Sequence, residues 1–286
     1  MAKKNLIIGG CTNYGINELK PWVLSANKQM PDAVKVMCVG NATVETRQWL
    51  INNNFTIVDM PKANIPVHVL RFLSIYDFLY KNWEDFEYVI TTDVKDVYFQ
   101  SDAFKWMDYW NVGVRDMQQI VAGTECLNYE DEPWGNENLM QCYGPYIHNQ
   151  FKKNEIYNVG VLGGSSEYIK DLVFNIFSNA INRPIPIVDQ AVFNVLINTQ
   201  PYKDVVLRAT QASGWACQAG TVADPTKMAG FRPHLLEAEP SFVDGIVYTS
   251  KGKPFAIVHQ YDRVPEWKKI VDEKYGVEDL ITFRTN

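Results

Sequence analysis

The amino-acid sequence predicts an α/β protein with a mostly parallel central sheet flanked by helices. In the first third of the chain, short apolar runs alternate with amphipathic stretches of helical length, which is typical of βαβ units. The apolar runs also lack polar alternation, as expected of strands that are covered on both faces. No internal repeat, low-complexity tract or linker-like break interrupts the 286 residues, so we expect one domain over residues 1–286.

Each element is assigned from its pattern. In the N-terminal part, we expect strands at residues 5–10, 33–40, 55–60 and 88–91, and helices at residues 17–30, 44–53 and 67–83. In the C-terminal part, we expect strands at residues 120–123, 156–163, 246–249 and 255–259, and helices at residues 167–180, 188–197 and 265–275. Residues 211–240 are expected to form loops.

Residues 125–154 are rich in polar and aromatic side chains and show no clear period. They predict a long structureless insertion, which in a compact domain is usually a lid or a binding loop. Trp134, Tyr143 and Tyr146 could offer ring faces to a ligand, or could simply pack in the protein. The run Glu130-Asp131-Glu132 is interpreted as a solvated turn.

Composition excludes several classes of protein. Hydrophobic residues make up 47% of the chain and charged residues 21%, which excludes a disordered chain. The formal net charge of −6 argues against non-specific binding to nucleic acid or anionic membranes. The sequence has no apolar run long enough for a transmembrane helix, and the run after Lys4 is too short for a signal peptide.

The five cysteines are odd in number, widely spaced and form no C-x-x-C pair. They predict reduced thiols rather than a disulfide framework or a zinc site. Together with the termini, they predict a soluble cytoplasmic protein.

The segment Asp93-Val94-Lys95-Asp96 directly follows a predicted strand. Ligands of open parallel sheets bind outside the carboxyl ends of the strands. If the chain turns after Asp93, the two carboxylates can converge and hold Mg²⁺ or Mn²⁺. Alternatively, Asp93 caps a loop and Asp96 pairs with a surface lysine.

A second candidate ligand is His259, which ends the predicted strand at residues 255–259. Its imidazole could complete an Asp/Asp/His metal site. Alternatively, it is an ordinary histidine at the end of a strand. His68 and His234 have no comparable context.

The order of these features resembles the metal-dependent GT-A glycosyltransferases, which move a sugar from a nucleotide diphosphate to an acceptor. The likeness spans residues 5–263. The D-x-x-D-V spacing with a late histidine is similar to the glycosyltransferase domain of procollagen lysyl hydroxylases, and the surrounding sequence resembles glycosyltransferases of large algal viruses. The resemblance to the GT-A glycosyltransferases is carried by the loop Gly10–Tyr14, Arg71, Asp93 and Asp96, Asn158-Val159-Gly160, Asp189-Gln190 and His259.

The resemblance implies a single GT-A domain, with a Rossmann-like nucleotide-sugar-binding half at residues 1–100 and an acceptor-binding, metal-completing half at residues 101–286. It implies Mn²⁺ or Mg²⁺ as cofactor, held by Asp93, Asp96 and His259. The implied nucleotide-binding residues are Gly10, Thr12, Asn13, Tyr14, Arg71 and Asp93. Lys95 stands where the commoner D-x-D motif has its second Asp, and either points away or packs beside the base.

The resemblance places Asn158 and Gly160 beneath the donor sugar, and Asp189 and Gln190 at the reacting carbon and the acceptor. Asp189 fits the base of an inverting enzyme, and Asp189, Gln190 or Asn158 fits a group beneath the ring of a retaining one. Alternatively, Asp189 is only the N-cap of its helix. Arg263 and Lys251 could add positive charge at the leaving group or could be surface cations.

The implied partners are a nucleotide-sugar donor, most often a UDP-sugar, and a glycan or glycoprotein acceptor; the implied enzyme is a hexosyl- or pentosyltransferase. A sugar nucleotidyltransferase is disfavoured because the loop Gly9–Gly15 has no basic residue. A non-catalytic nucleotide- or carbohydrate-binding module is disfavoured by the intact Asp/Asp/His set. A dehydrogenase is disfavoured because G-x-G-x-x-G is absent from the first turn.

Overall fold

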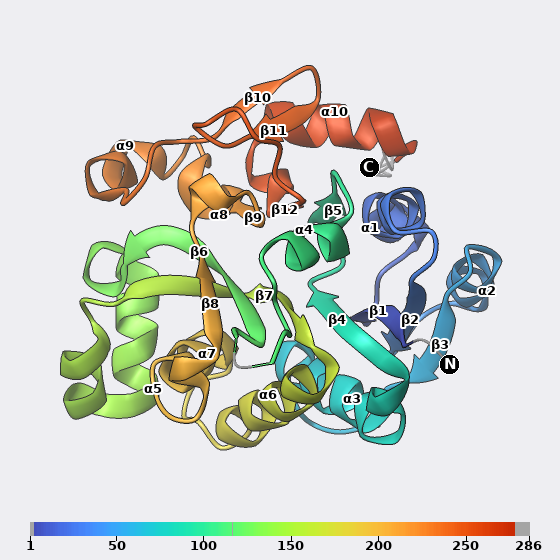
Figure 1. Ribbon diagram of the computed structural model, residues 1–286, viewed down its shortest axis with the longest axis horizontal. Coiled ribbons are helices and arrows are strands. Elements are labelled where there is room, and N and C mark those ends of the chain that lie inside the picture. Colours follow the sequence, from blue (N-terminus) through green and yellow to red (C-terminus); the bar gives the residue numbers. More distant parts are fainter. Residues whose placement is uncertain (1–2, 116, 278–286) are drawn as a thin grey trace, which may run out of the picture.

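The computed structural model describes residues 3–115 and 117–277 (Figure 1). The rest of the expected domain, residues 1–2, 116 and 278–286, lies outside the described residues. The strands are β1 (Lys4–Cys11), β2 (Val34–Val39), β3 (Thr56–Asp59), β4 (Phe86–Thr92), β5 (Val97–Phe99), β6 (Ile120–Asn128), β7 (Glu155–Ser165), β8 (Val206–Ala209), β9 (Ala216–Gln218), β10 (Ser241–Val243), β11 (Ile246–Tyr248) and β12 (Ile257–His259).

The α-helices are α1 (Ile16–Gln29), α2 (Val44–Asn52), α3 (Val67–Asn82), α4 (Ala103–Tyr109), α5 (Pro133–Phe151), α6 (Ser166–Ala180), α7 (Asp189–Ile197), α8 (Ala219–Val222), α9 (Met228–Phe231) and α10 (Pro265–Tyr275). Short 3₁₀ helices occupy Trp83–Asp85, Tyr129–Asp131, Tyr202–Asp204, Gln211–Ser213, Arg232–His234 and Tyr261–Arg263. Within the described ranges, no helix has both the length and the apolar character needed to cross a membrane.

The central sheet has seven strands in the order β3-β2-β1-β4-β7-β6-β8. Parallel pairing joins β3, β2, β1 and β4, and also β6 and β8, whereas β7 is antiparallel to both β4 and β6. All strands but β7 therefore run in one direction, and the predicted α/β fold with a mostly parallel sheet is confirmed. Because β7 runs in the opposite direction, its first residues lie at the edge of the sheet where β1 and β4 end.

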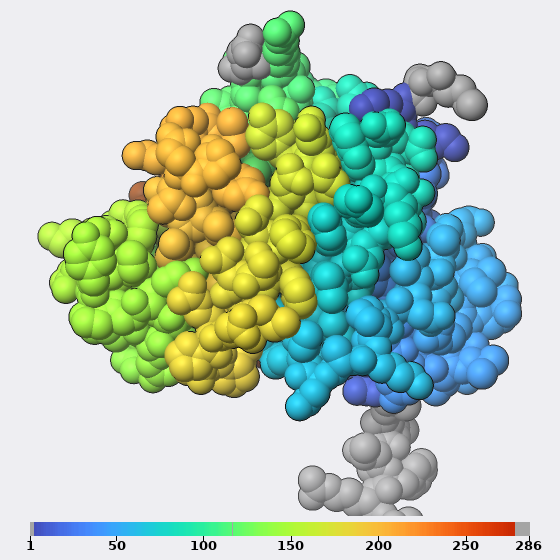
Figure 2. All heavy atoms as spheres, turned by 90° about the horizontal axis from the view of Figure 1, so that it is seen from below, coloured from blue at the N-terminus to red at the C-terminus, as the bar shows by residue number. Residues whose placement is uncertain are grey.

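Helices cover both faces of the sheet, because inner strands such as β1 are apolar on both sides. Along β1, Leu6 and Ile8 join the core beneath α3, α6 and α7, while Ile7 joins the core beneath α1 and α4. This alternation follows from the two-residue period of a strand. Helices α3 and α6 pack side by side across the lower face (Figure 2).

A second sheet, β5-β12-β9, lies above the first in Figure 1 and carries His259 at the end of β12. Beside it are the hairpin β10-β11 and helix α10, which share a separate core that includes Tyr98, Val258 and Trp267. The sequence predicted the strand at residues 255–259 but not β5 or β9. Each of these has only three residues, which is too short to show a period.

The expected structureless insertion at residues 125–154 is wrong. Strand β6 extends to Asn128, and α5 occupies most of the remainder. The helix is bent at Gly144, where φ is 74°, directly before Pro145. Because this Gly-Pro step divides the helical pattern into two short parts, the sequence shows no sustained period there.

Other differences concern short elements. The predicted loops at residues 211–240 contain β9, α8 and α9, and the sequence analysis assigned neither α4 nor β8. All five cysteines are described, and each is a buried free thiol, as predicted.

Candidate metal centre and active site

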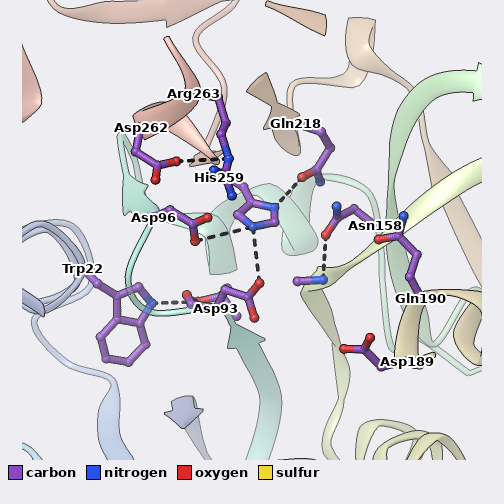
Figure 3. Close-up of polar contacts among 12 residues, drawn as sticks. Trp22, Asp93, Asp96, Asn158, Asp189, Gln190, Gln218, His259, Asp262 and Arg263 are labelled. Atoms are coloured by element: carbon purple, nitrogen blue, oxygen red, sulfur yellow. Dashed lines mark hydrogen bonds and ion pairs between the residues drawn. The ribbon is translucent and has the colours of Figure 1, made fainter. Parts of the chain in front are cut away.

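The candidate site lies at the edge of the main sheet where β1 and β4 end. Asp93 directly follows β4, and its N–H donates to the carbonyl oxygen of Gly160 at 2.8 Å. Because β7 runs opposite to β4, Asn158 and Gly160 in its first half reach this same edge. The indole Nε1 of Trp22 donates to Thr92 Oγ1 at 2.7 Å and holds the last residue of β4 (Figure 3).

Asp93, Asp96 and His259 converge there, as the sequence predicts (Figure 3). The chain bends after Asp93 instead of continuing as a strand, and the carbonyl oxygen of Asp96 accepts the N–H of Gln260 at 2.7 Å. His259 Nε2 lies 3.4 Å from Asp93 Oδ2 and 3.6 Å from Asp96 Oδ1. One ligand atom of each residue lies within 4.8 Å of the other two.

The imidazole of His259 is oriented to act as a ligand. Its Nδ1 donates to Gln218 Oε1 at 2.7 Å, which leaves the Nε2 lone pair facing the two carboxylates. Burial lowers the pKa of His259 and favours the neutral ring, and Nε2 is buried without a hydrogen-bond partner. A lone pair and two carboxylates repel one another unless a cation lies among them. The donor set therefore fits Mn²⁺ or Mg²⁺.

Gly160 keeps the space beside this triad open. A Cβ atom at this position would lie 2.6 Å from His259 Cε1 and 2.8 Å from Asp93 Oδ2. Both distances are shorter than real Cβ contacts, so any larger residue would push the ligands apart.

Arg71 links the candidate metal centre to α7. Its guanidinium is buried, pairs with Asp93, and lies 3.4 Å from Asp189 Oδ2. The N-cap of α7 is Val188, and Asp189 is the first residue of the helix without a capping hydrogen bond. The N-cap interpretation of Asp189 is therefore wrong: its carboxylate faces Arg71 at the positive end of the helix dipole.

Two neighbouring cavities meet at the triad. The first has a volume of about 350 Å³ and is lined in part by Gly10, Thr12, Arg71 and Lys95. The second has a volume of about 550 Å³ and is lined in part by Asn158, Asp189, Gln190 and His259. The residues that line both cavities are Tyr14, His68, Arg71, Asp93 and Arg263.

The first cavity contains most of the residues predicted to bind a nucleotide. The Nζ of Lys95 lies 5.6 Å from the ring centre of Tyr14. Asn13 does not line the cavity; its exposed side chain accepts from Asn41 Nδ2 at 2.6 Å. Arg263 lines both cavities, whereas Lys251 is exposed and lines neither.

The second cavity contains a glutamate that the sequence analysis missed. Glu125 Oε1 accepts from Asn158 Nδ2 at 2.6 Å and from Gln190 Nε2 at 3.0 Å. Burial raises the pKa of Glu125 above its ordinary value. Its position near the end of a strand of the main sheet was the available signal, but only the pairing of β6 with β7 places it beside Asn158.

Of the three aromatic residues whose rings could face a ligand, Trp134, Tyr143 and Tyr146, only Trp134 lines the second cavity. The Tyr143 ring packs against the Arg183 guanidinium, 3.9 Å from the ring centre, and Tyr146 is exposed. The solvated turn predicted at residues 130–132 is wrong for Glu132. Its buried side chain accepts the N–H of Gly135 as the N-cap of α5 and lines the second cavity.

Further lining residues were also missed. Asp262 lines the first cavity, His68 lines both, Thr221 and Lys227 line the second, and Gln218 orients His259 from behind. None of these residues belongs to a sequence motif, so only their three-dimensional neighbours identify them.

No known family model matches the chain, and none of the curated proteins matches its sequence. The residues of the two cavities and the triad are therefore the evidence for its chemistry.

Proposed function

We propose that the protein is a metal-dependent glycosyltransferase of the GT-A type. It would transfer a sugar from a nucleotide diphosphate, with a UDP-sugar as the first choice, to a hydroxyl group of a glycan or glycoprotein. The single observation that carries the proposal is the position of Asp93, Asp96 and His259 at the junction of two cavities.

The first cavity suits a nucleoside diphosphate. Tyr14 offers an aromatic face for a base, with Lys95 beside its ring. Arg71 and Arg263 place positive charge where the cavities meet, which attracts phosphate oxygens.

The carboxylates of Asp93 and Asp96 would by themselves repel a diphosphate. With His259 they would hold Mn²⁺ or Mg²⁺, and the bound cation would supply Lewis-acid stabilisation of the diphosphate leaving group. Gln218 would keep the histidine in the tautomer that the metal needs.

The second cavity suits the sugar and the acceptor. In the transfer, the acceptor oxygen forms a bond to the anomeric carbon as the bond from that carbon to the diphosphate oxygen breaks. The bonding electron pair leaves with the diphosphate. In an inverting reaction, Asp189 would accept the proton of the acceptor hydroxyl. In a retaining reaction, Asn158, Gln190 or Asp189 would stabilise the anomeric carbon from beneath the ring.

The test is thermal unfolding of the protein with UDP, GDP and several UDP-sugars, each with and without Mn²⁺. A nucleotide at a hundred times its Kd stabilises by about 2.7 kcal/mol. For a chain of this size, that corresponds to a rise in Tm of roughly 4–5 °C. If no nucleotide raises the Tm in a metal-dependent way, the proposal is wrong.

The matched variants are Asp96→Asn, in the triad, and Asp32→Asn, on the surface away from both cavities. Asp96→Asn should remove the Mn²⁺-dependent shift and the release of UDP from UDP-sugars while the protein stays folded. Asp32→Asn should behave like the unmodified protein. Full activity of Asp96→Asn would exclude Asp96 from the site.

A further inference from the structure

Three polar side chains of the second cavity, those of Glu125, Asn158 and Gln190, belong to one chain of hydrogen bonds. The N–H of Gly160 donates to Asn158 Oδ1 at 2.7 Å, and Asn158 Nδ2 donates to Glu125. Gln190 donates to the same oxygen, Glu125 Oε1. Glu125 thus joins the side-chain amide of Asn158 on β7 to that of Gln190 on α7.

Glu125 differs from Asp93, Asp96 and Asp189, which each lie beside Arg71 or His259. Only 4% of its surface is exposed, and no cation pairs with it among residues 3–115 and 117–277. Both amide hydrogen bonds go to Oε1. No protein group described in the structure hydrogen-bonds to Oε2, although the residue lines the cavity.

The backbone explains how Glu125 reaches this place. The pairing of β6 with β7 changes register between Ala122, which pairs with Leu162, and Gly123, which pairs with Asn158. A register shift of this kind redirects the side chains that follow it. The second half of β6 therefore brings Glu125 beside Asn158 and within reach of the first turn of α7.

We propose that Glu125 is a positioning residue, which fixes the side-chain amides of Asn158 and Gln190 so that their remaining polar atoms face the donor sugar. The identity of that ligand as a sugar rests on the proposed glycosyl transfer. The hydrogen bonds that position the two amides are observed independently of that proposed function.

This role requires an acceptor oxygen and not a negative charge. Burial without a cation raises the pKa of Glu125, which favours the neutral acid. The carbonyl oxygen of a neutral acid still accepts two amide N–H groups. Glutamine has the same shape and the same carbonyl oxygen, so Glu125→Gln should preserve the positioning, whereas Glu125→Leu should abolish it.

The first experiment measures the affinities for UDP and for UDP-glucose, UDP-galactose and UDP-N-acetylglucosamine in Mn²⁺. Glu125→Leu should lower the affinity for the best-bound UDP-sugar about tenfold, because two sugar-facing amides lose their orientation. It should leave the affinity for UDP within about twofold of the unmodified protein's. Glu125→Gln should keep both affinities within about threefold. The release of UDP from that UDP-sugar should fall about 100-fold in Glu125→Leu and be restored in Glu125→Gln.

The matched control is Glu155→Gln. Glu155 also bridges β6 and β7, through Thr124 and Tyr157, but lines neither cavity. The Glu155→Gln variant should leave the difference between the affinities for UDP and for the UDP-sugar unchanged. An equal loss in Glu155→Gln would show that the effect of Glu125→Leu is only structural. An equal loss in Glu125→Gln and Glu125→Leu would show that Glu125 acts through its charge, and would overturn the proposal.

The second experiment needs no ligand. The side-chain amide signals of Asn158 and Gln190, assigned with Asn158→Asp and Gln190→Glu, are followed by ¹⁵N NMR. The chemical shifts of these signals should be unchanged in Glu125→Gln and should move towards the chemical shifts of free amides in Glu125→Leu. Unchanged signals in Glu125→Leu would overturn the positioning role. If the unmodified protein binds no nucleotide, the proposed function fails, yet this experiment still decides whether Glu125 fixes the two amides.

Discussion

His259 Nε2 lies 3.4 Å from Asp93 Oδ2, and no hydrogen bond joins the two residues. The imidazole is held from its other side by Gln218 and the carboxylate by Arg71. Both of these potential ligands are therefore fixed by a neighbour that is not itself a potential ligand. This arrangement preorganises the two side chains of the candidate metal centre, and it makes their supporting residues testable.

Gln218→Leu should lower the affinity for Mn²⁺ about 10- to 100-fold, because His259 loses the acceptor that sets its tautomer and ring orientation. Isothermal titration calorimetry of the purified protein with Mn²⁺ measures this affinity. The control, Gln141→Leu, changes an exposed glutamine of α5 and should leave the affinity unchanged. An unchanged affinity in Gln218→Leu would contradict the orienting role of Gln218.

Gly160→Ala should abolish Mn²⁺-dependent binding of UDP, since the added Cβ would overlap His259 Cε1 and Asp93 Oδ2. The matched control is Gly230→Ala, where a Cβ would meet nothing within 4 Å. The increase in Tm caused by UDP with Mn²⁺ measures both variants. Equal shifts in the two variants would show that the metal lies elsewhere.

Arg71→Met should lower the free energy of unfolding by about 3 kcal/mol, because it leaves the buried Asp189 and the partly buried Asp93 without their cation. Arg232→Met removes the exposed pair with Glu239 and should leave the free energy of unfolding nearly unchanged. Urea unfolding monitored by circular dichroism measures both. A loss below 1 kcal/mol in Arg71→Met would mean that the two carboxylates do not depend on this guanidinium.

The thiols should not react with Ellman's reagent in the folded protein at pH 8. All five are buried, and burial raises the pKa to about 12 for Cys11 and Cys38 and to about 11 for Cys142. Because these pKa values lie above the pH, the reactive thiolate form is scarce. Unfolding in guanidinium chloride should release five reactive thiols. Rapid reaction of the folded protein would contradict the burial of the thiols.

Most of the fold could be predicted because its signals are local. The apolar runs of β1, β2 and β4 and the amphipathic pattern of α3 and α6 are visible in the sequence. Helix α5 could not be predicted, because Gly144 and Pro145 interrupt its pattern. The strands β5 and β9 are stabilised by pairing with β12, an interaction between segments far apart in the chain.

The candidate site, like the fold, could be predicted only in part. Asp93, Asp96 and His259 could be predicted because each ends or follows an apolar strand. Glu125 and Gln218 could not. Nothing in their own segments marks them, and they join the site only through the β6–β7 register and the packing of β9 beside β12.

The sequence by itself determined the alternation of strands and helices, the burial of both sheet faces and the types of side chain available as metal ligands, since these depend on local periodicity and composition. The tertiary structure decided that β7 runs against its neighbours, which brings Asn158 and Gly160 to the edge that holds Asp93. It also decided that Asp189 faces Arg71 instead of capping its helix. Strand direction and ion pairing of this kind depend on contacts between distant segments, which a local pattern does not specify.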